Sequence, residues 1–490
     1  MRGGSGCPES MSPVTTDAAG TADLGATDLD AAAVAGEGVW APARRRLTAG
    51  LVLTITLVAF EALAIATIMP VVADDLGGLG LYGWVFSGFF LGNLLGIVLA
   101  GEAADRRGTR TPFLAGLVLF SLGLMVGGAA QSMPMLVAGR VAQGVGAGVI
   151  PAVAYASVGR GYPPELRPRV FAVFSSAWVV PGLVGPAAAS AIERWSSWRV
   201  VFLALLPLVA VAAAMTLPAL SPHAPTGAAP LPEIAGHDRR RDAVVLVAGV
   251  ALVLGGLGAH QLALAVILIL VGVLPAAWAF VRLVPTGTVV LRPGMPAAVG
   301  VRGILTFAFF GTDAYVSLAM TDARDQPTWV AGLALTGATL AWTTGAWIQQ
   351  RVVGGRGPAW LVRRGFILLG AGIAGLLVAL DPSVPVAVAI PAWSVAGLGM
   401  GLAYAPISVT VLGTAAPGQE GSASASLQLT DVLGVSLGTG LGGVFVALGD
   451  GRGWDTSSSL TLAFIVTLAV AAGGVLAAWR LPRRLPAGAA

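Results

Sequence analysis

A short charged stretch decides the fold: Gly101-Glu102-Ala103-Ala104-Asp105-Arg106-Arg107-Gly108-Thr109-Arg110. We call it the charged island. It lies between two long apolar runs, residues 81–100 and 112–130. An apolar run of about 20 residues is long enough to cross a lipid bilayer as a helix. The charged island is therefore expected to be a short loop that joins two membrane helices, and its arginines favour the cytoplasmic side.

The composition indicates a chain that crosses the membrane many times. Of its 490 residues, 56% are hydrophobic and only 11% are charged, which no ordinary soluble domain matches. All 28 basic residues are arginines, so both the lysine of an ATP-binding P-loop and a Schiff-base lysine are excluded. The single cysteine, Cys7, and three scattered histidines do not form a metal site. We expect no catalytic residues, no metal and no cofactor.

Fourteen apolar segments follow a polar tail. Residues 1–46 are expected to be a disordered cytoplasmic tail, because their first forty are rich in small and polar residues without periodicity. The predicted spans are residues 47–72, 81–100, 112–130, 134–153, 170–192, 200–220, 244–257, 262–281, 297–320, 330–347, 366–380, 384–412, 423–448 and 460–479.

The arginines support this count. With the N-terminus inside, the arginine clusters fall in cytoplasmic segments, and the only arginines outside are Arg194, Arg199, Arg324 and Arg452. Cytoplasmic loops of membrane proteins carry such an excess of arginine. We therefore expect a multi-pass protein of the cell membrane with both termini in the cytoplasm.

The chain divides into two similar halves. The segment Gly144-Val-Gly146-Ala-Gly148 recurs as Gly397-Leu-Gly399-Met-Gly401, and the charged island recurs weakly as Gly345-x3-Gln349-x-Arg351. Repeated halves are typical of secondary transporters, which bind substrate between them. The predicted organisation is a six-helix bundle over 47–220, a linker over 221–243, two extra membrane helices over 244–281 and a second six-helix bundle over 297–480.

The charged island resembles a family signature. Its matching residues are Gly101, Asp105, Arg106, Gly108 and Arg110, which fit the signature between spans 2 and 3 of the major facilitator superfamily. The resemblance implies the major facilitator fold and a conformational switch at these residues, where the acid bridges the two halves. The alternative is a loop whose arginines only fix the orientation in the membrane.

Two ionisable residues of the first half are candidates for proton coupling. Charged groups inside a membrane are costly, so each is a functional candidate. Glu61 stands nine residues before Pro70. This spacing resembles span 1 of the fourteen-span drug:proton antiporters, where the acid is usually an aspartate.

Arg140, with Gln143 and Gly144, resembles the span 4 motif of the same antiporters, and the resemblance implies a part in proton coupling. Because arginine does not release its proton, Arg140 would act electrostatically on a nearby carboxyl. Glu61 and Arg140 could each instead be structural, bonded between helices.

Two acids of the second half are further candidates. Asp313, in the first helix of that half, is expected to be the counterpart of Glu61. Together with Phe310 and Tyr315 it could hold a cationic substrate through its charge and aromatic faces. Alternatively, Asp313 lies near the outer end of its span and is hydrated. Asp431 is a second proton or cation site or a partner for Arg302, and the antiporters often have a basic residue at its position.

Span 5 contains Pro181-Gly182-x2-Gly185-Pro186, which resembles the antiporter signature. The two glycines expected after it are replaced by Ala189 and Ser190. Glycine and proline allow a membrane helix to bend and pack closely, which a rocking bundle needs. Plain helix packing is the alternative explanation.

The sequence thus predicts an all-α polytopic membrane protein of the major facilitator fold. Its expected function is proton-coupled efflux of hydrophobic or cationic compounds by alternating access. The expected partners are protons, a small-molecule substrate and membrane lipids, with no nucleic acid, and we expect a monomer. The nearest alternative is export of an endogenous metabolite, peptide or lipid. An intramembrane enzyme would need a nucleophile and a base that face each other within the spans, and no histidine or lysine is available there. A sensor would need a soluble output domain, and none of the loops is long enough to form one.

Overall fold

The computed structural model is all-helical in the residues it describes. These are 38–42, 44–162, 166, 169–170, 173–174, 177, 179–220, 238–259, 261–414 and 420–482. Most of the expected N-terminal tail and of the 221–243 linker therefore lies outside the described residues. The long apolar runs satisfy their backbone hydrogen bonds within helices, as a lipid environment requires.

The helices follow the predicted spans. The first half contains α2 (Arg45–Leu76), α3 (Tyr82–Arg107), α4 (Arg110–Gly128), α5 (Met133–Gly161), α7 (Val179–Trp195), α8 (Trp198–Leu203) and α9 (Leu205–Thr216). The middle and second half contain α10 (Arg239–Leu257), α11 (Leu262–Leu283), α12 (Met295–Thr321), α13 (Thr328–Arg356), α14 (Pro358–Ala379), α15 (Ala389–Gly413), α16 (Glu420–Asp450) and α17 (Thr456–Ala477). Short 3-10 turns lie at helix ends: η1 (Leu79–Leu81), η2 (Leu217–Ala219), η3 (Val386–Val388) and η4 (Ala478–Arg480).

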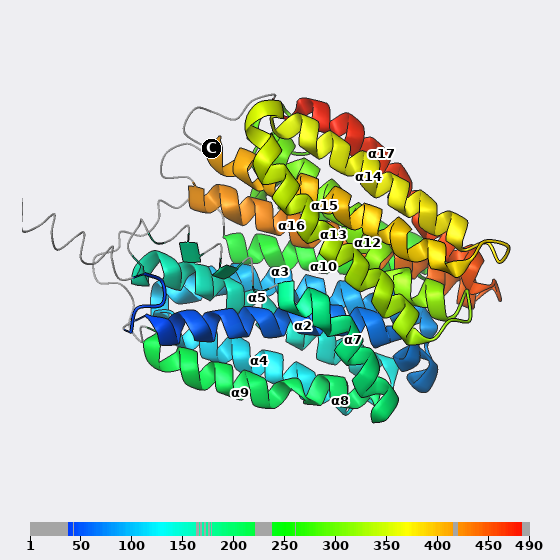
Figure 1. Cartoon of the computed structure of the whole chain (residues 1–490), viewed down its shortest axis with the longest axis horizontal. Coiled ribbons are helices and arrows are strands. Elements are labelled where there is room, and N and C mark those ends of the chain that lie inside the picture. The colour runs from blue at the N-terminus through cyan, green and yellow to red at the C-terminus, as the bar shows by residue number, and fades with distance from the viewer. Residues whose placement is uncertain are drawn as a thin grey trace, which may run out of the picture.

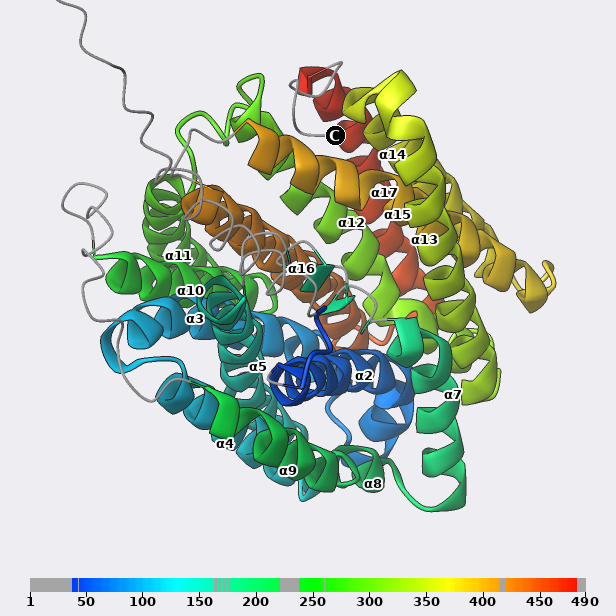
Figure 2. The ribbon, with the colours of Figure 1, turned by 60° about the vertical axis from the view of Figure 1, so that its left-hand side comes forward.

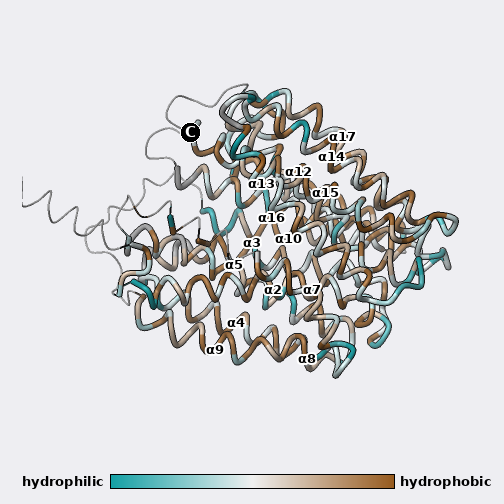
Figure 3. The backbone as a smooth tube through the Cα atoms, viewed as in Figure 1, coloured by the Kyte–Doolittle hydropathy of each residue, from teal (hydrophilic) through white to brown (hydrophobic). Residues whose placement is uncertain are grey.

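Eleven described segments are long and apolar enough to cross a membrane. At the three remaining predicted spans, 170–192, 244–257 and 330–347, stand α7, α10 and α13. The count of fourteen spans therefore stays a prediction. Figure 3 shows the hydrophobic residues running along the helices, with hydrophilic ones gathered at the ends. The lipid-facing character is plain on α11, where the Leu274 side chain is 73% exposed.

The two halves of the chain form two groups of helices, with α10 between them (Figure 1). The helices α3 of the first half and α16 of the second pack against each other, and α10 packs against both. One apolar cluster joins the three helices and includes Leu91, Leu246, Leu254 and Leu433. Figure 2 shows α11 on the outer side of α10. The extra pair thus covers the seam between the two halves.

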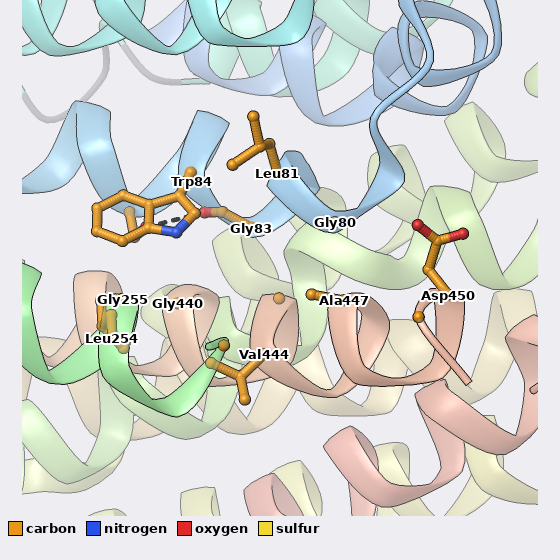
Figure 4. A pocket seen from close by; sticks show the side chains of 14 residues that line it. Gly80, Leu81, Gly83, Trp84, Leu254, Gly255, Gly440, Val444, Ala447 and Asp450 are labelled. Atoms are coloured by element: carbon orange, nitrogen blue, oxygen red, sulfur yellow. Dashed lines mark hydrogen bonds between the residues drawn. The ribbon is translucent and has the colours of Figure 1, made fainter. Parts of the chain in front are cut away.

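Contacts between the halves gather at the end of α3 that is opposite the charged island. The Tyr82 hydroxyl donates to the carbonyl oxygen of Ala314 at 3.4 Å, and the Ser436 hydroxyl donates to that of Ser87 at 3.3 Å. A cavity of about 350 Å³ opens at this part of the seam, lined by residues of α3, α10 and α16. Figure 4 shows Trp84, Leu254 and Asp450 among its lining side chains.

The charged island is mostly helical, which differs from the loop that the sequence predicted. Helix α3 continues to Arg107 and α4 begins at Arg110, so the connection is only two residues long. Gly108 ends α3 with a φ of 73°, a left-handed conformation that favours glycine. The structure does not describe the side chains of Glu102, Asp105 and Arg106, so the predicted bridge from Asp105 stays a prediction.

The second half contains the same turn, but not where the sequence placed it. Gly357, between α13 and α14, also has a φ of 73° and matches Gly108. A Cβ on Gly345 would press on the carbonyl oxygen of Leu398, as one on Gly96 would on that of Val145. Gly345 is therefore the counterpart of Gly96 rather than of Gly101. The predicted recurrence of the charged island at residues 345–351 is wrong, because the close helix contacts of Gly345 match those of Gly96, which precedes the island.

The predicted single span 200–220 consists of two helices. Helix α8 ends at Leu203 and α9 begins at Leu205. Pro207 follows closely, and proline has no backbone N–H to donate to the carbonyl four residues earlier. The missing hydrogen bond falls at Leu203 and explains the break.

The repeated glycine segments hold the fourth helix of each half close to two neighbours. A Cβ on Gly144 or Gly148 would overlap carbonyl oxygens of α3, and a Cβ on Gly146 would overlap the backbone of α4. Gly397, Gly399 and Gly401 make the same contacts with α13 and α14. Backbones can approach this closely only where no side chain intervenes. The predicted repetition of the two halves therefore extends to their packing.

Candidate functional site

Glu61 and Arg140 form a buried ion pair between α2 and α5. Both side chains are almost completely enclosed, with exposed fractions of 1% and 2%. Arg140 Nη1 donates to Glu61 Oε1, and Arg140 Nε donates to the carbonyl oxygen of Val85 at 3.2 Å. The guanidinium also lies over the Phe89 ring, 4.2 Å from its centroid. The carboxyl that Arg140 was expected to act on is therefore Glu61.

Gln143 completes this group. Its side-chain Oε1 accepts a hydrogen bond of 2.7 Å from Arg140 Nη1. Two polar atoms of the group, Glu61 Oε2 and Gln143 Nε2, are buried without a hydrogen-bond partner among the described residues. Leaving such atoms unpaired costs free energy. The group therefore has a carboxylate oxygen and an amide donor available for another arrangement.

Asp313 has a different partner in the second half. The indole Nε1 of Trp393, on α15, donates to Asp313 Oδ1 at 2.8 Å. Asp313 retains an exposed fraction of 8%, whereas Trp393 is fully buried. The predicted position of Asp313 in the first helix of the second half is confirmed, but its bonding partner is a neutral donor.

An aromatic cluster surrounds this carboxyl. The Phe309 ring stacks on Trp393 with a centroid distance of 5.1 Å and an interplanar angle of 19°. Trp342 contacts both Phe309 and Phe310, at centroid distances of 5.4 and 6.2 Å. Tyr404 continues the cluster, 5.4 Å from Trp342. The cluster thus joins three helices of the second half, α12, α13 and α15.

The cluster ends at a second ion pair, between Asp431 and Arg302. Arg302 Nε donates to Asp431 Oδ1 at 2.6 Å, and the Tyr404 hydroxyl donates to Asp431 Oδ2 at 3.1 Å. Arg302 also lies over the Tyr404 ring at 3.0 Å from its centroid. Of the two alternatives for Asp431, the structure shows the partnership with Arg302.

Tyr315 lies apart from this group. Tyr315 stands two residues after Asp313 on α12. Because each residue turns the helix by about 100°, the two side chains point to nearly opposite sides. Tyr315 accordingly packs its ring against Tyr82 of α3, and its hydroxyl donates to the Thr439 carbonyl oxygen at 2.5 Å. The contacts of Tyr315 therefore lie at the seam between the halves, while Phe310 belongs to the aromatic cluster.

The span 5 residues lie on α7, which bridges the halves. The nearest atoms to a Cβ on Gly185 would belong to Phe60 and Leu63 of α2, at 3.7 Å. On the other side of α7, a Cβ on Gly182 would overlap the Thr339 side chain of α13. A Cβ on Gly332 of α13 would lie 3.6 Å from the carbonyl oxygen of Pro186. Glycine and proline thus permit close packing on both sides of this helix.

Three residues of the aromatic cluster were not predicted from the sequence: Trp393, Trp342 and Tyr404. One indication of Trp393 was available: it stands four residues before Gly397, as Arg140 stands four residues before Gly144. Recognition of Trp342 and Tyr404 required the fold, because they reach the cluster from different helices.

Comparison with known proteins agrees with this architecture. The family model of the Major Facilitator Superfamily matches residues 51–439. A probable multidrug-efflux transporter of Mycobacterium tuberculosis is 27% identical over 451 residues, which cover 88% of this chain and 94% of that protein. Multidrug resistance protein 3 of Bacillus subtilis is 30% identical over 162 residues, covering 33% of this chain and 32% of that protein.

Solved structures share the fold at low identity. An inward-facing, unoccupied bacterial homologue of the human lysosomal transporter Spinster has a TM-score of 0.62 at 15% identity, covering 90% of this chain and 98% of that one. An auto-inhibited peptide transporter of the POT family also reaches 0.62, at 17% identity, covering 89% and 95%. Because the family model matches well over half of the sequence, this chain is a membrane transporter of the major facilitator superfamily.

Proposed function

We propose that this protein exports hydrophobic or cationic compounds in exchange for protons and that Glu61 carries the proton. The observation that carries the proposal is the enclosed pair of Glu61 with Arg140. A buried arginine without its carboxylate partner is strongly unfavourable. Protonation of Glu61 would therefore destabilise this arrangement of α2 and α5 and favour another one. Such differential stability is what a bound proton needs in order to shift a conformational equilibrium.

The surroundings of the pair supply the parts of a switch. When Glu61 is neutral, its carboxyl can donate a hydrogen bond, and Gln143 Nε2 remains available as a donor for a second acceptor. Arg140 keeps its bond to Val85 and its contact with Phe89, so its charge is not left wholly without partners. The arginine stays charged throughout, and only the carboxyl gains or loses a proton.

Three further roles belong to the proposal. The charged island, with Asp105, would link the proton site to movement of the two halves, and Asp313 would recognise cationic substrate. The protein would act in the cell membrane with both termini in the cytoplasm, as the distribution of arginines supports. The multidrug-efflux names of the relatives support the substrate class.

Efflux from energised cells tests the proposal. Cells that express the wild-type protein should lose preloaded ethidium faster than cells with an empty vector, and a protonophore should remove the difference. Glu61→Gln imitates the protonated acid and should reduce the rate to that of the vector control at equal membrane expression. An unchanged rate in Glu61→Gln would contradict proton transfer at this residue.

Export of an endogenous metabolite on the same fold is the second candidate. It predicts no difference in ethidium efflux, together with a compound that accumulates outside only the expressing cells. Metabolite profiling of medium and cells, on the same cultures, separates the two functions.

A further inference from the structure

The two halves place different residues at one equivalent position. Arg140 and Trp393 each stand four residues before the repeated glycine segment of their helix. Each bonds the acid in the first helix of its own half, Glu61 or Asp313. The glycine segments make equivalent contacts in both halves, so the correspondence is one of structure as well as of spacing.

The exchange of arginine for tryptophan changes the charge of the site. The indole N–H is a neutral donor, whereas a guanidinium would cancel the charge of the carboxylate. Among the described residues Asp313 bonds only Trp393, through Oδ1, so Oδ2 is left without a partner. Arg302, on the same helix, is eleven residues away, about 16 Å along the axis, and is already paired with Asp431.

Aromatic rings lie beside the bond between Asp313 and Trp393. Phe309, one helical turn before Asp313, stacks on Trp393, and Trp342 meets its edge. Aromatic faces attract organic cations, most strongly where water is excluded. Asp313 is 8% exposed whereas Glu61 is 1% exposed, and Phe310 and Trp342 are also partly exposed. The second acid is therefore the more accessible of the two.

We propose that Trp393 determines the charge preference of the transporter. By occupying the position of the arginine, it holds one oxygen of Asp313 and leaves the other to bind a monovalent organic cation against the aromatic cluster. This assignment rests on the proposed export function and specifies its substrate site. An arginine at position 393 would occupy the carboxylate and remove the preference for cations.

Binding to the purified full-length protein in detergent tests the assignment without any proton gradient. The probes are tetraphenylphosphonium, a permanent cation, and triphenylphosphine oxide, a neutral compound of similar aromatic surface. Asp313→Asn preserves an acceptor for the indole and should weaken tetraphenylphosphonium binding by at least about tenfold. Trp393→Arg should do the same, whereas Trp393→Phe, which adds no charge, should retain the preference for the cation.

Neutral-probe binding and thermal unfolding report whether each variant is folded. The neutral probe should bind Asp313→Asn within about twofold of wild type, which is less than about 0.5 kcal/mol, and in Trp393→Arg it should lose less affinity than the cation does. Absence of tetraphenylphosphonium binding to wild type, or equal losses for both probes in Asp313→Asn, would overturn the assignment. So would unchanged cation binding in Trp393→Arg. If Trp393→Arg does not fold, Trp393→Lys, which also places a positive charge beside Asp313, takes its place, and unchanged tetraphenylphosphonium binding in it would equally overturn the assignment. Failure of proton-driven export would leave these binding results unaffected, so the two proposals can fail separately.

Discussion

At the scale of single residues, each half holds a buried acid bonded to a donor: Arg140 bonds Glu61, and Trp393 bonds Asp313. A lone acid and a lone arginine within apolar spans are conspicuous, because charge is costly in a membrane. Their pairing was not evident, since 79 residues separate them. Asp313 was predicted as a functional residue for the same reason. Its neutral partner Trp393 was not predicted, because a tryptophan in an apolar helix is common and carries no charge.

Arg140→Lys should abolish uphill, proton-driven transport. Arg140 uses Nη1 for Glu61 and Gln143 and Nε for Val85, whereas a lysine has a single ammonium at the end of its chain. Keeping the charge therefore does not keep the geometry. Downhill exchange of substrate across proteoliposomes without a gradient should survive. Normal uphill transport by this variant would place Arg140 among structural residues.

Asp431→Asn should lower the thermal stability. It would leave the Arg302 guanidinium, whose side chain is 5% exposed, without its carboxylate. We expect a loss of about 1–3 kcal/mol, below the about 3–5 kcal/mol of fully buried pairs, because the Asp431 side chain is 21% exposed. Asp450→Asn, an exposed acid on the same helix, is the control. Altered proton coupling at unchanged Tm would instead favour Asp431 as a proton site.

At the scale of helices, apolar runs predicted the spans well, because a membrane leaves few alternatives to the helix. Helix ends were less predictable. The polar residues of the charged island continue the helix until Gly108 turns the chain. The hydrophobic pattern does not predict whether such polar residues are helical. The true counterpart of that turn, Gly357, became evident only from the contacts between helices.

Gly144→Ala should destabilise the first half. The new methyl group would overlap the carbonyl oxygen of Phe89 and force α3 and α5 apart, at a cost of about 1–3 kcal/mol. Gly473→Ala is a matched control, because a Cβ there has no neighbour within 4 Å. Thermal unfolding of both purified variants should show a lower Tm only for Gly144→Ala. Equal Tm values would mean that the glycine segment is not closely packed.

The charged island should govern conformational switching rather than substrate choice. Asp105→Asn removes the acid that, by resemblance, links the halves at this end. Transport of every substrate should fall to a small fraction of wild type, while expression and substrate binding survive. Transport of one cationic and one neutral compound is the measurement. Loss of only one of them would assign Asp105 to substrate selection.

At the scale of the whole molecule, the two halves share a backbone plan but differ in charge. Helix packing repeats down to individual glycines, as an internal duplication predicts. The two equivalent acids have different bonding partners, since Glu61 bonds an arginine and Asp313 bonds a tryptophan. The repetition could be predicted from the sequence because close helix packing requires glycines at regular spacing, and this spacing is visible in both halves. The division of labour could not be predicted, because it depends on partners brought from other helices.

This asymmetry agrees with an exchanger that separates its two tasks. The enclosed first acid suits a proton, which needs little space, and the more accessible second acid suits a bulky cation. Exchange of one proton for one monovalent cation moves no net charge, so the pH gradient alone drives it, by about 1.4 kcal/mol per pH unit. For a neutral substrate the proton's charge also crosses the membrane potential, which adds about 2.3 kcal/mol per 100 mV. The extra helices α10 and α11 lie beside the seam, where α10 packs against α3 and α16.

Transport into proteoliposomes with an imposed pH gradient tests the central claim most directly. Ethidium, which is permanently charged, should accumulate in acid-loaded vesicles that contain the wild-type protein, and nigericin should abolish the accumulation. Vesicles with Glu61→Gln should show no response to the gradient, yet should still exchange ethidium when no gradient is present. Gradient-driven accumulation at the wild-type rate in Glu61→Gln would contradict the account.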